Sequence, residues 1–414
     1  MKEEIINNLN NPRQLEKLYR DNKATFKKEF NLIFTNIQDS PTAQIWNERL
    51  NFEDEEISWG TNNELIFVIV VSFIAGLIAK IPAFTAITYD FFYPRNTAFV
   101  VFPLLAAYFS WRQSMQLKKV IAISAAILIS AVYINVLPGN SKSDTLILAC
   151  IHLPLFLWAV LGYTFVGNNL KSYHKRLDFL RYNGDLLVMT AIILIAGAIL
   201  TGITIGLFSL IKIEIREFYL EYIVVWGLAA APIVGTYLVQ TNPQLVNKVS
   251  PVIAKVFTPL VLATLVIYLI AVIGTGKDPY NDREFLLIFN LLLIGVMAII
   301  LFSVAETSKH SDSKIGILLL FGLSVVTIIV NGIALSAILF RISEWGITPN
   351  RLAVLGGNVL ILTNLFFVAY RLFKTTRDRN EIEMVEKSIA VFLPIYGVWT
   401  IIVTFIFPIL FNFK

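Results

Sequence analysis

Apolar residues come in long blocks that recur from residue 64 to the C-terminus, with short polar stretches between them. A helix of about 20 apolar residues is long enough to cross the 30 Å hydrocarbon core of a bilayer. A helix in water shows a polar stripe, which these blocks mostly lack. The pattern therefore predicts an all-α fold, a polytopic transmembrane helical bundle.

The blocks predict eleven spans. We place them at about 64–85, 97–111, 119–136, 144–166, 184–211, 219–240, 251–273, 284–305, 314–340, 352–373 and 388–412. The second is the weakest, because about 15 residues cover only some 22 Å at 1.5 Å per residue.

The distribution of positive charge supports the second span. With eleven spans, 24 of the 34 Lys and Arg residues fall on the side of the N-terminus and 10 on the other. Without that span the two sides hold 16 and 18, and the asymmetry disappears. Because cytoplasmic loops are enriched in Lys and Arg, we predict a cytoplasmic N-terminus and a C-terminus outside.

Composition agrees with a membrane protein. Hydrophobic residues make up 56% of the 414 residues and charged residues 15%, against about 25% charged in a soluble domain. The net charge of +5 follows from the cationic loops, and no basic-aromatic patch points to a nucleic-acid partner. The single cysteine, Cys150, lies within an apolar block and cannot form an intramolecular disulfide.

Residues 1–63 form a separate, strongly charged segment before the membrane domain, residues 64–414. Apolar residues from Leu15 to Ile37 recur mostly at helical spacing, and Ser40 with Pro41 begins a second short helix through Trp46. Two helices in about 50 residues bury too little surface to be stable alone. We therefore expect them to pack on each other and on cytoplasmic loops, or to lie at the membrane surface; the alternative is docking of a protein partner.

Four polar residues lie within spans and are the candidates for substrate binding: His152, Asn290, Asn331 and Asn364. A neutral histidine bonded to a backbone carbonyl explains the first without a function. Interhelical amide bonds of about 0.6 kcal/mol each explain the others. A substrate site requires these side chains to converge on one cavity.

Proline falls inside five spans, at Pro103, Pro154, Pro232, Pro259 and Pro394. Because proline removes a backbone donor, we expect it to interrupt these helices, as at the midplane sites of transporters.

The fifth span carries a stripe of small residues, Ala198, Gly202 and Gly206. Such a stripe lets another helix approach closely, and we expect that helix to belong to the same chain rather than to a second copy.

The polar stretch between spans nine and ten contains three further candidates for substrate contact, Arg341, Glu344 and Arg351. Thr348 and Pro349 read as the start of the tenth span, and Gly346 as a turn residue. A structural cap explains the stretch, and a substrate gate on the outer face is the alternative.

This stretch resembles the signature of a bacterial family of multi-pass membrane proteins, domain of unknown function 4153. The likeness rests on Arg341, Glu344-Trp345-Gly346 and Thr348-Pro349-Asn350-Arg351, and it extends over most of the membrane region. Residues 12–17 and 46–50 resemble the cytoplasmic leader of a Bacteroidetes-type subgroup. The resemblance implies location in the bacterial inner membrane, and it carries no activity.

Three functions remain open. A transporter or permease for a neutral or lipidic substrate fits many spans with few intramembrane acids, and no Walker motif indicates ATP hydrolysis. A membrane-embedded assembly or sensory component would dock partners through residues 1–63. An intramembrane lipid-modifying enzyme would draw on a loop with Asp278, Asp282, Arg283 and Glu284. The sequence predicts no catalytic residue, metal ligand or cofactor. It predicts membrane lipids as partners.

Overall fold

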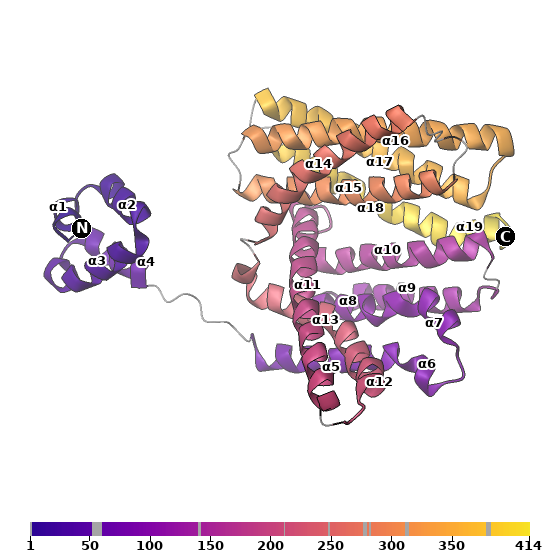
Figure 1. Ribbon diagram of the computed structural model, residues 1–414, viewed down its shortest axis with the longest axis horizontal. Helices are drawn as coiled ribbons and strands as arrows, with labels where there is room; N and C mark the ends of the chain where they lie inside the picture. Colours follow the sequence, from indigo (N-terminus) through magenta and orange to yellow (C-terminus); the bar gives the residue numbers. More distant parts are fainter. Residues whose placement is uncertain are drawn as a thin grey trace. The chain divides into compact units, whose positions relative to one another are not determined.

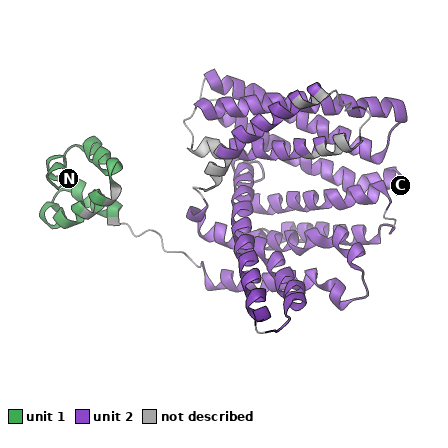
Figure 2. Cartoon of the chain, viewed as in Figure 1, with its two compact units in different colours: residues 1–59 green, residues 60–414 purple. Residues whose placement is uncertain are grey.

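All regular secondary structure in the described part of the protein is helical (Figure 1). The computed structural model describes residues 2–51, 60–139, 142–210, 212–246, 249–275, 280, 283–310, 314–377 and 382–414, and these contain no strand. The chain divides into two compact units, Met1–Trp59 and Gly60–Lys414, which Figure 2 colours separately. Each unit is described by itself below.

The first unit has four helices rather than the two expected. They are α1 (Lys2–Asn7), α2 (Pro12–Asp21), α3 (Lys23–Ile37) and α4 (Pro41–Asn51). The predicted continuous helix is divided at Asn22, whose side-chain oxygen accepts a hydrogen bond from the backbone N–H of Thr25 at 3.1 Å. An asparagine in this position satisfies a donor at the start of α3, so the chain ends α2 and begins α3 there.

These four helices enclose an apolar core of their own. Its buried members are Ile5, Leu15, Phe26, Phe30, Ile33, Ile37, Ala43, Trp46 and Leu50. The apolar residues that predicted helix in this region all belong to this core or pack against it. The first unit thus buries its apolar faces within itself.

The second unit is a bundle of long helices joined by short irregular segments. Its elements are α5 (Asn62–Ala79), α6 (Ile81–Phe84), α7 (Tyr89–Asn96), the 3₁₀ turn η1 (Thr97–Val100), α8 (Phe102–Arg112), α9 (Leu117–Val136), α10 (Asp144–Val166), α11 (Tyr173–Leu210), α12 (Arg216–Phe218), the π turn η2 (Tyr219–Val224), α13 (Val225–Thr241), the 3₁₀ turn η3 (Pro243–Leu245), α14 (Val249–Thr275), α15 (Arg283–His310), α16 (Lys314–Trp345), α17 (Pro349–Arg377), α18 (Ile382–Ile401), the π turn η5 (Ile402–Ile406) and α19 (Phe407–Leu410).

A helix stands at each of the eleven predicted spans. Within the described residues, eight helices are long and apolar enough to cross a membrane, and two shorter apolar stretches lie at Val256–Ile270 and Leu292–Ala305. This architecture is that of an all-α integral membrane protein. The count of eleven crossings and the direction of the chain across the membrane remain predictions.

The helix at the short second predicted span, α8, is largely enclosed by protein. Leu105, Ala106, Tyr108 and Phe109 of α8 are each at most 2% exposed. Because protein encloses this helix on these faces, its length is not set by the thickness of the lipid.

Proline does not break the long helices. Helices α10, α13, α14 and α18 continue through Pro154, Pro232, Pro259 and Pro394. The expected interruptions are therefore wrong at these four positions. Pro103 lies in the first turn of α8, where a missing N–H costs nothing.

The stripe of small residues does not pack within the chain. In Figure 1, α11 crosses the direction of α10 and α17. Residues 191–210 of α11 contain no buried side chain. A Cβ atom added at Gly202 or Gly206 would meet nothing within 4 Å. The expectation that Ala198, Gly202 and Gly206 contact a helix of the same chain is therefore wrong for the described structure.

Candidate functional site

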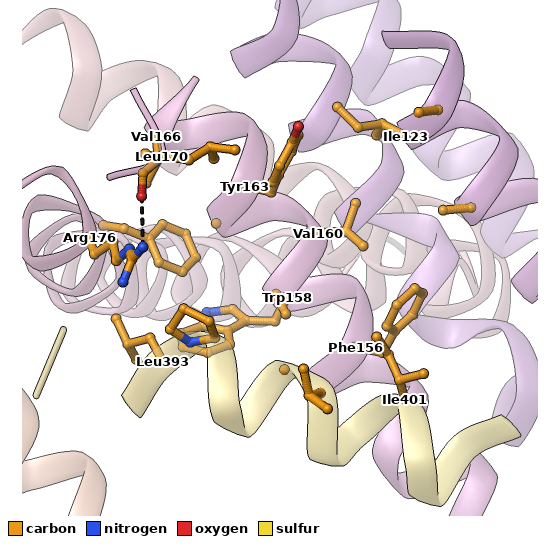
Figure 3. A pocket seen from close by; sticks show the side chains of 18 residues that line it. Ile123, Phe156, Trp158, Val160, Tyr163, Val166, Leu170, Arg176, Leu393 and Ile401 are labelled. Atoms are coloured by element: carbon orange, nitrogen blue, oxygen red, sulfur yellow. Dashed lines mark hydrogen bonds between the residues drawn. The ribbon is translucent and has the colours of Figure 1, made fainter. Parts of the chain in front are cut away.

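An apolar pocket of about 530 Å³ lies among α9, α10, α11 and α18, and Figure 3 shows it from close by. We call it the α10–α18 pocket. Its described lining comprises Ala122, Ile123, Ala126, Phe156, Trp158, Ala159, Val160, Gly162, Tyr163, Val166, Leu170, Arg176, Phe179, Leu393, Pro394, Gly397, Val398 and Ile401. Arg176 is the one charged residue in this set. The pocket is therefore suited to an apolar chain with a polar group at the Arg176 end.

The position of Arg176 follows from a proline. Pro394 has no N–H, so the carbonyl of Ala390 lacks the donor that residue 394 would otherwise supply. Arg176 Nη1 donates to that carbonyl oxygen at 3.1 Å, and Nη2 donates to the carbonyl oxygen of Leu170 at 2.7 Å (Figure 3). These two bonds hold the guanidinium at the end of the pocket.

The indole of Trp158 contributes ring surface to the wall, because its polar atom has a partner elsewhere. Its Nε1 donates to Oδ1 of Asn183 at 2.9 Å, and its ring packs on Phe179 with centroids 5.1 Å apart. Asn183 in turn donates from Nδ2 to the carbonyl oxygen of Phe179 at 2.5 Å. One polar side chain of α11 thus fixes the tryptophan against the pocket.

The pocket opens to the surface of the second unit. Val398 and Ile401 line it and are 55% and 41% exposed, and Ala122 on the α9 side is also exposed. Exposed apolar side chains on a membrane-spanning bundle face lipid chains. The pocket is therefore open on an apolar face of the bundle.

His152 does not belong to the described lining of this pocket. Its Nδ1 lies 2.9 Å from the carbonyl oxygen of Leu148, one turn earlier in α10. This is the local bond that explains a membrane histidine without a substrate.

The three asparagines have protein partners of two kinds. Asn358 Nδ2 donates to Oδ1 of Asn290 at 2.8 Å, and Asn331 Nδ2 donates to the carbonyl oxygen of Asn358 at 3.2 Å. Asn364 Nδ2 instead donates to the Tyr396 hydroxyl at 2.9 Å. The amide oxygens of Asn331 and Asn364 are buried without a hydrogen-bond partner.

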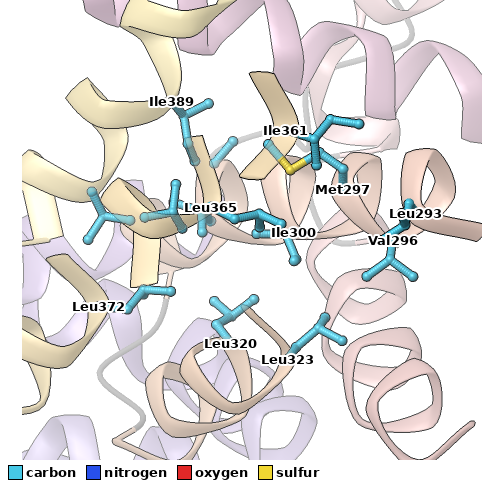
Figure 4. Close-up of a cluster of buried hydrophobic side chains, with 14 of the residues drawn as sticks. Leu293, Val296, Met297, Ile300, Leu320, Leu323, Ile361, Leu365, Leu372 and Ile389 are labelled. Atoms are coloured by element: carbon cyan, nitrogen blue, oxygen red, sulfur yellow. The ribbon is translucent and has the colours of Figure 1, made fainter. Parts of the chain in front are cut away.

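The two sets of asparagine bonds join helices around one apolar core. Figure 4 shows that core, in which Leu293, Leu320 and Leu365 come from α15, α16 and α17. Asn290, Asn331 and Asn358 link the same three helices, whereas Asn364 links α17 to α18. His152 shares no hydrogen bond with them. The structure thus does not gather the four span residues at the α10–α18 pocket.

The loop before α17 is held by hydrogen bonds from two arginine side chains to backbone carbonyl groups. Arg351 Nη1 donates to the carbonyl oxygens of Trp345 and Gly346 at 2.8 and 2.7 Å. Arg341 Nε donates to the carbonyl oxygen of Tyr280 at 2.8 Å, and both guanidinium groups lie within 6 Å of the Trp345 ring centroid.

The expected local geometry of this loop is present. Gly346 has a φ of +75°, and the hydroxyl of Thr348 accepts from the N–H of Arg351 at 3.3 Å at the start of α17. Glu344 is exposed and Arg351 binds backbone rather than this carboxylate. These contacts account for both arginines as structural residues of the turn.

Sequence reasoning missed a buried cluster at the start of α5. Glu64 is 9% exposed, and its Oε1 accepts from the Tyr108 hydroxyl and from Arg112 Nη1, each at 2.6 Å. Arg112 also donates to the carbonyl oxygen of Gln240 at 3.2 Å. Opposite charges at the adjoining ends of two predicted spans were the available signal.

A second missed cluster joins α11, α15 and α18. Arg181 donates to Glu386 Oε1 at 3.0 Å, to Asp178 Oδ1 at 2.8 Å and to the carbonyl oxygen of Ala305 at 2.8 Å. Glu386 is 6% exposed. Because Glu386 and Ala305 are far from Arg181 in sequence, only the fold reveals these two contacts.

A third missed pair lies at the end of α5. Lys80 is 3% exposed, and its Nζ lies 3.1 Å from Oε1 of Glu221 and 4.3 Å from the Tyr222 ring centroid. Glu221 belongs to the π-helix η2. The hydrophobic pattern does not show which residues of such a segment face Lys80.

Comparison with protein-family models, with curated proteins and with solved structures found no match. Within the described residues, no group of three or more His, Cys, Asp or Glu side chains is placed to hold a metal ion. Asp278 and Asp282 lie outside the described residues, and the side chains of Arg283 and Glu284, at the start of α15, are not described either.

Proposed function

We propose that this integral membrane protein takes a lipidic substrate into the α10–α18 pocket and acts as a transporter or permease for it. The observation that carries the proposal is a 530 Å³ cavity with apolar walls, exposed apolar side chains at its mouth and one guanidinium at its end. Ligand pockets commonly measure about 300–1,000 Å³. We also propose membership of the family named domain of unknown function 4153, on the residues quoted above.

The choice of a lipidic substrate follows from the environment of the pocket. Burial of an apolar chain gains little in a membrane, because lipid tails are as apolar as the pocket wall. Selectivity must then come from shape and from the polar end. Arg176 lies in a segment with Lys171 and Lys175, which offers positive charge to an acidic or phosphate-bearing head group.

A second candidate function is docking of a protein partner by the first unit. Ile6, Leu32 and Ile45 are 44%, 58% and 68% exposed on a unit that has a buried apolar core of its own. A helical module with its own core and exposed apolar side chains supports the assembly or sensory hypothesis.

The transport proposal is tested by filling the pocket. Ala122 lines it and Ala125, on the same helix and also exposed, does not. Full-length protein carrying Ala122→Trp or Ala125→Trp is reconstituted into liposomes with a fluorescent phospholipid and a diazirine-bearing phospholipid.

We expect wild-type protein and Ala125→Trp to accelerate transbilayer movement of the fluorescent lipid, and to be cross-linked within residues 156–166. Ala122→Trp should lower both signals severalfold. Equal cross-linking of the two variants would contradict lipid entry into the pocket. Normal cross-linking without transbilayer movement in the wild type would rule out transport and leave lipid binding.

A further inference from the structure

A second cavity, of about 640 Å³, lies between α7 and the beginning of α10. Its lining includes Thr88, Asp90, Phe91, Arg95, Ile147 and Ile151. It shares helix α10 with the α10–α18 pocket but none of that pocket's lining residues. We call it the Arg95 cavity, and the inference drawn from it goes beyond the proposed function.

Arg95 is a buried cation with unused hydrogen-bonding capacity. Its residue is 5% exposed, its Nε donates to the carbonyl oxygen of Ile134 at 3.1 Å, and its Nη2 is buried with no hydrogen-bond partner. The guanidinium lies 4.1 Å from the ring centroid of Phe91, one turn earlier in α7. Arg95 is one of the residues that line the cavity, and these contacts do not neutralise its charge.

The neighbouring residues hold Arg95 in this place. Asn96 Nδ2 donates to Asn135 Oδ1 at 2.9 Å, and Asn135 Nδ2 donates to Asn96 Oδ1 at 2.8 Å. This reciprocal amide pair fixes the end of α7 against α9. The guanidinium is therefore positioned before any ligand arrives.

An anion would complete this arrangement. A buried charge without a partner is costly, because no opposite charge is present whose attraction would offset the cost of desolvation. In the described part of the chain, no carboxylate lies within 4.0 Å of the Arg95 guanidinium. A phosphate oxygen at Nη2 would supply both the missing acceptor and the missing charge.

The remaining lining narrows the choice of anion. Asp90 is exposed and shares the cavity, so it disfavours a ligand that carries only negative charge and favours one with a cationic group as well. Ile147 and Ile151 are 45% and 57% exposed along one wall, which suits an apolar chain. Phosphate, amine and acyl chain occur together in a zwitterionic phospholipid.

We propose that the Arg95 cavity binds the head group of an amine-bearing phospholipid. Its phosphate lies at Arg95, its ammonium group at Asp90 and its chain along Ile147 and Ile151. The charge distribution of the loops predicts that this site faces the outer leaflet.

The test is native mass spectrometry of the full-length protein in detergent. Phosphatidylethanolamine, phosphatidylglycerol and inorganic phosphate are added separately and in competition. The variants are Arg95→Gln and Asp90→Asn, and the matched control is Arg216→Gln, at an exposed arginine outside the cavity lining. We expect Arg95→Gln to weaken phosphatidylethanolamine binding by about tenfold or more, as for loss of a charged hydrogen bond.

Asp90→Asn should remove the preference for phosphatidylethanolamine over phosphatidylglycerol, and Arg216→Gln should leave both unchanged. Wild-type affinity in Arg95→Gln would overturn the proposal, and displacement of the lipid by inorganic phosphate would identify a free-anion site instead. If Arg95→Gln does not fold, Asp90→Asn decides, because an unchanged preference in that variant overturns the proposal by itself.

Discussion

Arg176 and Pro394 are linked through a single carbonyl group: the proline leaves the carbonyl of Ala390 without a helical donor, and the arginine supplies one at 3.1 Å. The bond joins α11 to α18 at the end of the α10–α18 pocket. The carbonyl that the proline leaves without a helical donor thus accounts for the contact made by the arginine. Neither role is evident from the sequence alone.

This link predicts non-additive mutations. Arg176→Met leaves the carbonyl of Ala390 without a donor and should destabilise the protein by about 1–3 kcal/mol. Pro394→Ala restores a backbone N–H to the helix. Arg176→Met should therefore lower the free energy of unfolding clearly less in the Pro394→Ala protein than in the wild type. Reversible unfolding in mixed detergent micelles measures the cycle. Strictly additive effects would show that the two residues act independently.

Two glycines in long helices should respond oppositely to alanine. A Cβ atom at Gly356 would lie 2.1 Å from the Trp399 ring, so Gly356→Ala should cost about 1–3 kcal/mol through overpacking. Gly202 has open space around it, so Gly202→Ala should be neutral or stabilise by up to about 1 kcal/mol. Thermal unfolding in detergent compares the two. Destabilisation by Gly202→Ala would instead reveal an unseen partner helix on α11.

The two carboxylate partners of Arg181 should differ in importance. Glu386 is buried, and its removal in Glu386→Ala leaves a buried guanidinium poorly compensated, which should cost about 3–5 kcal/mol. The Asp178 side chain is 49% exposed, so Asp178→Ala should cost about 0–1 kcal/mol. Unfolding of the two variants side by side provides the measurement, and equal losses would contradict the assigned roles.

Glu16 should make the first unit sensitive to acid. The Arg20 hydrogen bond, with a further one from Arg49, holds the pKa of Glu16 below its usual value of 4.5. Its contribution to stability is therefore fully present above the unfolded pKa and is lost as the pH falls through the lower, folded pKa.

Glu16→Gln tests this in the full-length chain, with Glu48→Gln at an exposed position of α4 as the control. At neutral pH, residues 1–59 should be less resistant to protease in Glu16→Gln than in the wild type. This difference should shrink below about pH 4.5. A difference that does not change with pH would exclude an ionic cause.

The periodicity of apolar residues predicted the helices of the membrane region well, because blocks such as 144–166 and 314–340 have no other stable form in lipid. It failed where a local polar contact decides the outcome. Asn22 divides one expected helix into α2 and α3, and the expected breaks at Pro154 and Pro394 are absent. The outcomes at Asn22 and Pro394 involve single hydrogen bonds, which periodicity does not record.

The candidate site was harder to predict than the fold. His152 and the asparagines stood out because polar residues in a span are conspicuous, yet each has a protein partner. The pocket is built from residues such as Ala122 and Gly397, which are ordinary in any membrane helix. Arg95 looked like one more loop charge, and its burial follows from the way α7 folds back against α9.

A density map of the protein in lipid nanodiscs tests the central claim most directly. We predict an elongated density between α9, α10 and α18, passing Trp158 and ending near Arg176. A pocket closed by its own side chains, with lipid density confined to the outside of the bundle, would contradict the proposed site.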